Sequence, residues 1–128
     1  MLEPIQLVGT ALQAQCPRDV RKVLLYAEIE EGVVAASVFF ETATNGLQFR
    51  YASDELERLT YEFWEVGSGS ILPKSWRAIE YALVGQKLTV DLTYREEFKA
   101  NEGEHERRPK VIARQFPGLN PNFSNPDG

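Results

Sequence analysis

The chain has 128 residues, with 14 Lys and Arg against 19 Asp and Glu, a net charge of -5, one His and one Cys. The length fits one domain, a single Cys excludes an internal disulfide framework, and one Cys with one His cannot build a zinc site of the usual kind. The acidic balance also disfavours general binding to a nucleic-acid backbone, which needs clustered Lys and Arg.

The sequence contains no recognisable targeting or membrane segment. Its start, Met1-Leu2-Glu3-Pro4, lacks the basic and apolar regions of a signal peptide. The longest apolar run, residues 33–40, is far shorter than the roughly 20 residues needed to span a bilayer. We therefore expect a cytoplasmic protein.

A first helix is predicted over residues 4–15. Ile5, Val8 and Leu12 recur at the spacing of one helix face. Cys16 follows, and because a proline comes directly after it, the helical conformation is disfavoured there and the helix should end.

Three strands are expected over residues 20–31, 33–44 and 47–51, and the last two are joined by the hairpin signal Asn45-Gly46. The first strand alternates in a way that is typical of a strand with one buried face. Its buried face is expected to carry Val23, Leu25, Ala27 and Ile29, and its exposed face Lys22, Leu24, Tyr26, Glu28 and Glu30.

A second helix is predicted over residues 54–66 from the helical spacing of its apolar residues. Residues 67–70 read Gly-Ser-Gly-Ser and predict a flexible connection. Residues 76–84 and 87–95 then predict a hairpin with a two-residue loop. The exposed face of this hairpin is expected to carry Glu80, Thr89, Asp91, Thr93 and Arg95.

The charge changes sign abruptly near the C-terminus. Residues 96–106 hold five Glu and one Lys, whereas residues 107–114 hold four basic residues and no acid. We expect the first segment to be an exposed loop and the second to fold back on the acidic body. A helix from Pro109 to Gln115 would dock through Ile112 and Phe116. The folded domain should span residues 1–116, followed by an irregular tail over residues 117–128.

Familiar catalytic patterns are missing. His105 lies among glutamates, no Gly-x-Ser-x-Gly elbow is present, and residues 67–70 lack the Gly-Lys-Ser/Thr ending of a phosphate loop. Cys16 has only Arg18 as a basic neighbour in the sequence, so we expect a packed rather than a reactive thiol. We therefore predict no enzyme and no catalytic, cofactor or metal site.

The landmarks follow one another in an informative order. After the opening helix come the strand Val20–Ile29, the pair Phe39-Phe40, a helix over residues 53–65, the segments Trp76–Tyr81 and Gly85–Tyr94, then Glu106-Arg107-Arg108 and Phe116. Over residues 1–116 this order resembles the YezG-like family of bacterial immunity proteins, which is associated with polymorphic toxins and contact-dependent growth inhibition systems. The resemblance implies an α+β fold and a non-catalytic role, in which the protein binds a cognate toxin, often a nuclease, and blocks it.

The expected fold is a single α+β domain, in which an antiparallel, twisted sheet of about five strands packs helices 4–15 and 54–66 on one face. A nuclease carries a basic substrate groove, and an acidic protein can either occupy that groove or bind beside it and distort it. The opposite sheet face or the Glu-rich loop would bind this toxin directly. The candidate contact residues are Glu28, Glu30, Asp91, Arg95, Glu96, Glu97, Glu102, Glu104 and Glu106.

Two other functions stay open. An acidic secretion-effector chaperone would form a homodimer and hold an extended peptide in an apolar groove. A small hydrolase using strand carboxylates would need a buried Glu pair lining a pocket. A homodimer is compatible with an immunity protein as well.

Overall fold

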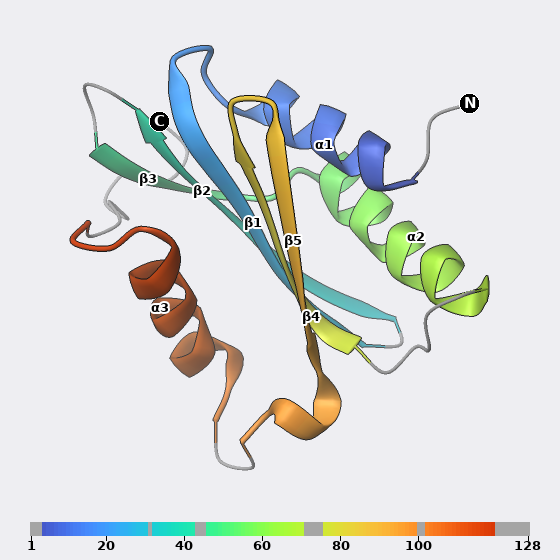
Figure 1. Ribbon diagram of the computed structural model, residues 1–128. Coiled ribbons are helices and arrows are strands. Elements are labelled where there is room, and N and C mark those ends of the chain that lie inside the picture. Colours follow the sequence, from blue (N-terminus) through green and yellow to red (C-terminus); the bar gives the residue numbers. More distant parts are fainter. Residues whose placement is uncertain (1–3, 31, 43–45, 71–75, 100–101, 120–128) are drawn as a thin grey trace.

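A five-stranded antiparallel sheet with the strand order β3-β2-β1-β4-β5 forms the centre of the structure, a computed structural model (Figure 1). The structure describes residues 4–30, 32–42, 46–70, 76–99 and 102–119. The elements in chain order are α1 (Pro4–Gln15), β1 (Val20–Glu30), β2 (Val33–Thr42), β3 (Gly46–Tyr51), α2 (Asp54–Ser70), β4 (Trp76–Val84), β5 (Lys87–Tyr94), the 3-10 helix η1 (Arg95–Glu97) and α3 (Glu104–Gln115). The chain is a single α+β domain, as predicted.

β1 is the central strand because it pairs with β2 on one side and with β4 on the other. The β4–β5 hairpin turns at Gly85, whose φ of 62° lies in the left-handed region that favours glycine. β4 carries an irregularity in its pairing with β5 between Trp76 and Ala78. The predicted strands are confirmed within the described residues, where their ends differ from the prediction by at most one residue. The strand ends predicted at residues 31 and 43–44, and Asn45 of the predicted turn, lie outside the described part of the chain.

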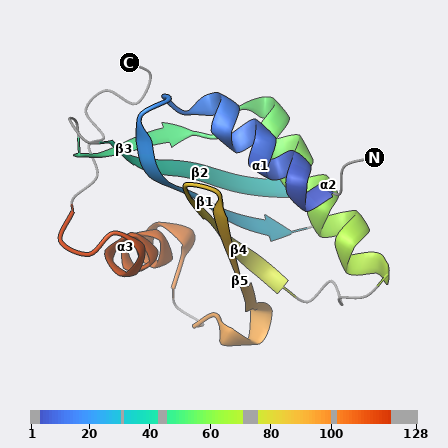
Figure 2. The same ribbon diagram turned by 45° about the horizontal axis from the view of Figure 1, so that its top comes forward.

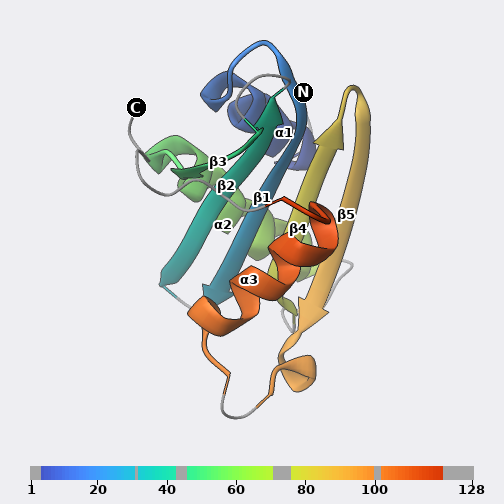
Figure 3. The same ribbon diagram turned by 90° about the vertical axis from the view of Figure 1, so that its left-hand side faces the viewer.

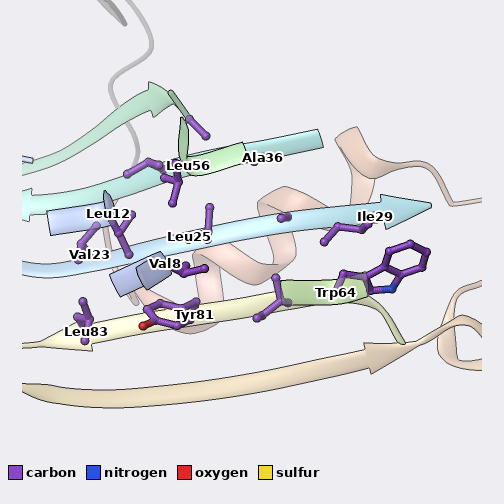
Figure 4. Packing of buried hydrophobic residues seen from close by; sticks show 14 of the residues in the cluster. Val8, Leu12, Val23, Leu25, Ile29, Ala36, Leu56, Trp64, Tyr81 and Leu83 are labelled. Atoms are coloured by element: carbon purple, nitrogen blue, oxygen red, sulfur yellow. The ribbon is translucent and has the colours of Figure 1, made fainter. Parts of the chain in front are cut away.

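α1 and α2 cover one face of the sheet, as predicted (Figure 2). Val8 and Leu12 of α1 pack with Leu56 and Trp64 of α2 in the main hydrophobic core, against side chains of β1, β2 and β4 (Figure 4). The hydroxyl of Tyr81 in β4 donates a hydrogen bond of 2.6 Å to a main-chain carbonyl of α1. This core therefore joins both helices to the centre of the sheet.

α3 lies across the opposite face of the sheet (Figure 3). A second core lies between α3 and the sheet. It contains Val111 and Ile112 of α3, Phe116, which directly follows α3, and residues of the sheet that include Leu24 and Tyr26 of β1. β1 is consequently buried on both faces, so the prediction that Leu24 and Tyr26 are exposed is wrong. The physical reason is that α3 packs on this face of β1, which the alternation of apolar and polar residues predicts to face solvent.

Two of the helices are longer than predicted. The main chain of α2 stays helical through Ser70, so residues 67–70 continue the helix instead of forming a flexible connection. α3 begins at Glu104, which places part of the expected acidic loop in its first turn and Pro109 in its interior. The Gly103 N–H donates to Glu106 Oε1 at 3.0 Å and caps this start. No helix in the described part of the chain is long and apolar enough to cross a membrane.

Candidate protein-binding surface

Glu28 of β1 is held by Arg107 of α3. The Arg107 Nε and Nη2 atoms donate to Glu28 Oε2 and Oε1 at 2.8 and 2.6 Å, and the Tyr26 hydroxyl donates to Oε2 at 2.5 Å. The two charged side chains are only 16% and 12% exposed. The Arg107 guanidinium also lies 3.9 Å from the ring centroid of Phe98. Glu28 was a candidate contact residue, but its carboxylate is engaged inside the protein.

Glu80 of β4 is bound in the same manner. Arg114 donates to its two oxygens at 2.7 and 2.8 Å, and Gln115 Nε2 donates to Oε1 at 2.8 Å. The Glu80 side chain is only 6% exposed, so its predicted place on a solvent-facing surface is wrong. A buried carboxylate needs such partners because an unpaired charge away from water is strongly unfavourable.

The basic segment therefore folds back on the acidic body, as predicted. Arg108 Nη1 donates to Ser37 Oγ of β2 at 3.1 Å, and Lys22 Nζ of β1 donates to the Gln115 carbonyl at 2.5 Å. Hydrogen bonding to Glu28 is the main cause that raises the pKa of Arg107 above its ordinary value. Burial, followed by the hydrogen bond to Glu28, raises the pKa of Tyr26, which keeps its hydroxyl a neutral donor.

Three exposed glutamates lie at the end of the sheet where β1 ends, β2 begins and β5 passes into η1, an end that can be followed in Figure 1. Glu30 closes β1, while Glu96 and Glu97 lie in η1, and all three side chains are exposed. We call these three residues the acidic end. Beside it lies a shallow cavity of about 280 Å³ lined by Glu28, Ile29, Glu30, Val33, Ala35, Arg77, Phe98 and Arg107.

The cavity combines apolar, acidic and basic side chains. Val33 is 59% exposed, and Phe98 is half-buried beneath the Arg107 guanidinium. Arg77 stacks over the Trp64 ring at 5.6 Å, and its Nη1 atom is buried without a hydrogen-bond acceptor among the described residues. An exposed apolar centre with a charged rim is the usual anatomy of a protein-binding surface.

The other candidate residues of the expected loop are largely engaged within α3 and its approach. The Glu102 side chain is 13% exposed and pairs with Lys110, whose hydrogen bond is the main cause that lowers the pKa of Glu102. Glu104 Oε2 lies 3.7 Å from Arg108 Nε and forms an ion pair with it. Glu106 is 51% exposed but caps α3 through Gly103. These residues support the helix, and only Glu106 among them still faces solvent broadly.

Two candidate residues stand apart from this group. Asp91 is exposed on β5, opposite Glu80 in the register, and lies four positions before η1, about 13 Å away along the extended strand. The Arg95 main chain opens η1, but its side chain lies outside the described part of the structure. The structure therefore does not unite all nine candidates into one surface.

Arg107, Arg114 and Phe98 were not among the predicted site residues. One signal could have found the two arginines: they are seven residues apart and therefore lie on the same face of a helix. No comparable signal marks Phe98, because its position depends on how the chain returns from η1 to α3.

The described residues contain no group of three or more His, Cys, Asp or Glu side chains placed to hold a metal ion. Burial raises the pKa of the Cys16 thiol to about 11, so the thiol stays protonated at neutral pH. The chain matches no protein-family model and no curated protein.

Proposed function

We propose that this chain is an immunity protein that binds a cognate bacterial toxin, a nuclease with a basic surface, and neutralises it through the acidic end. The observation that carries the proposal is the separation of the carboxylates into two groups. Glu28 and Glu80 are neutralised inside the protein by Arg107 and Arg114. The acidic end stays exposed, and its Glu30 lines a cavity that also carries apolar side chains.

Such a surface suits a folded, basic partner. Exposed carboxylates attract a positively charged protein over long range and raise its association rate. The exposed Val33 and the half-buried Phe98 would supply apolar contact area at the centre of the interface. The resemblance to the YezG-like family supports the same class of partner.

A chaperone function has one observation in its favour. A groove of about 410 Å³ runs between α1 and α2 and is lined in part by Leu7, Ala11 and Leu59. Leu7 is 36% exposed and would offer apolar contact area to an extended apolar segment bound in this groove. The groove also carries charged residues of α2, and a chaperone would use it in place of the acidic end.

The hydrolase alternative has less support from the geometry. Glu28 lines the cavity, but both of its oxygens accept hydrogen bonds from Arg107. A general acid or base needs a carboxylate that can reach the substrate and exchange a proton with it.

Growth protection tests the proposal. The chain should be co-expressed with the folded toxin domain encoded beside its gene, and complex formation should be measured with the purified proteins. We expect protection of the cells and a stoichiometric complex with the folded domain. Absence of both binding and protection would contradict the proposal, and binding only to an unfolded segment of the neighbour would support the chaperone instead.

A further inference from the structure

β5 forms an outer edge of the sheet, since only β4 pairs with it. The two-residue turn makes Val84 and Lys87 the first pair of the hairpin, and such a pair exchanges main-chain hydrogen bonds. Main-chain groups alternate in direction along an antiparallel strand. The N–H and C=O groups of Leu88, Val90 and Leu92 therefore point away from β4, toward the open edge.

At the opposite edge of the sheet, side chains donate hydrogen bonds to two main-chain carbonyls of β3. On β3, Arg50 Nη1 donates to the Phe49 carbonyl at 2.8 Å, and Gln15 Nε2 of α1 donates to the Tyr51 carbonyl at 2.6 Å. On β5, Glu97 Oε1 accepts a hydrogen bond of 3.1 Å from the N–H of Tyr94, the last residue of the strand. Unprotected strand edges are templates for pairing with another strand.

The side chains of β5 are complementary to a second copy of the same strand. An antiparallel partner related by a two-fold axis at Thr89 would place Lys87 of each copy opposite Asp91 of the other. These would be non-hydrogen-bonded pairs, in which the side chains approach most closely. Both charged residues are exposed. Centring the axis on Asp91 would instead bring two like charges together.

The main chain fits the same register. With the axis at Thr89, Leu88 of one copy faces Val90 of the other, so the outward N–H and C=O groups of both residues meet their counterparts. Leu88 is 38% exposed and Val84, beside the turn, is 52% exposed, so apolar area is available next to the new ladder. A ladder of this kind continues the sheet from one copy into the next.

We propose that β5 is a homodimerisation edge, through which a second copy of this chain adds antiparallel to the first with the two-fold axis at Thr89. This inference goes beyond the toxin-binding proposal and does not depend on it. It places Asp91 in the dimer contact, about 13 Å along the strand from the start of η1.

Sedimentation equilibrium of the full chain over a wide concentration range tests the dimer. The wild-type protein should associate reversibly to twice its mass of 14.5 kDa. Leu88→Pro removes an outward N–H but no hydrogen bond to β4, so it should raise the dimer dissociation constant by about 10-fold or more. Leu88→Ala keeps that N–H and should have a smaller effect. Far-ultraviolet circular dichroism should show that both variants stay folded.

Charge exchange tests the register. Lys87→Asp and Asp91→Lys should each weaken the dimer because each places like charges opposite one another, whereas the double variant K87D/D91K should recover the wild-type constant to within about threefold. A wild-type protein that stays monomeric at about 100 µM, a dimer that Leu88→Pro leaves unchanged, or a double variant no better than the single ones would each overturn the proposal.

Discussion

Arg107 and Glu28 form a two-point ion pair that joins residues 79 positions apart in the sequence, with N–O distances of 2.6 and 2.8 Å. A planar guanidinium that meets both oxygens of a carboxylate fixes direction as well as distance. The pair therefore fixes where the first half of α3 crosses β1, and Arg114 with Glu80 does the same where the second half crosses β4.

Removing Arg107 should destabilise the protein strongly. Arg107→Ala leaves the Glu28 carboxylate buried without its counter-charge, which should lower the free energy of unfolding by about 3 kcal/mol in urea titrations. Arg58→Ala is the matched control, since its ion pair with Glu62 has side chains that are 57% and 50% exposed. The control should change stability by about 0.5 kcal/mol at most, and equal losses in both variants would contradict the role of the buried pair.

Phe116 should be essential to the second core. Its ring is 2% exposed, and Lys22 Nζ lies 4.9 Å from its centroid. Phe116→Ala should lower the unfolding free energy by about 3–5 kcal/mol because it opens a cavity between α3 and the sheet. Leu88→Ala, at a residue that is 38% exposed, should cost much less. Denaturant titration of both variants measures the difference, and similar losses would show that α3 is not packed as described.

Gly9 should be intolerant of alanine although it lies inside a helix. A Cβ atom at this position would lie 2.6 Å from the Tyr81 hydroxyl oxygen, a distance that Cβ atoms essentially never show to a non-bonded atom, so a neighbour would have to shift. Gly9→Ala should therefore destabilise the protein by about 1–3 kcal/mol, whereas the same change in an exposed helix interior is stabilising. In the double variant G9A/Y81F the loss should be smaller than the sum of the single losses. Additive losses in thermal unfolding would contradict the clash.

Stability should fall at high pH partly through Tyr26. Burial raises the pKa of Tyr26 in the folded protein above its ordinary value of 10.0. Above pH 10 the unfolded chain therefore loses this proton while the folded protein retains it, so stability is present below pH 10 and declines as the pH rises beyond it. The decline in wild type should exceed that in Tyr26→Phe by about 1 kcal/mol per pH unit. Parallel curves for the two proteins, measured by urea unfolding, would contradict this origin.

The sequence predicted the elements well where one face of a segment is apolar. Val8 and Leu12 of α1 and Val23 and Leu25 of β1 share one core, and their spacing alone indicated it. The prediction was wrong where a distant segment covers a face that carries polar residues. Leu24 is an apolar residue on the supposed exposed face of β1, and it was the local sign that this face is covered too.

The candidate site was only partly predictable for the same reason. The reversal of charge at residue 107 correctly predicted that the basic segment returns to the acidic body. Which carboxylates it would neutralise depends on where α3 crosses the strands. That crossing is set by long-range packing and the register of β1 and β4, and no local pattern in the sequence reports it.

The affinity of the purified toxin domain for two charge-reversed variants tests the acidic end most directly. E30K/E96K changes two exposed glutamates of the acidic end. E55K/E65K makes the same change in charge at exposed positions of α2, the helix that packs with α1 on one face of the sheet. Isothermal titration calorimetry at low salt should give a dissociation constant about 10-fold or more weaker for E30K/E96K and nearly unchanged for E55K/E65K. Equal losses in both variants would show that net charge alone governs binding, and a loss confined to E55K/E65K would place the toxin on the opposite side of the protein.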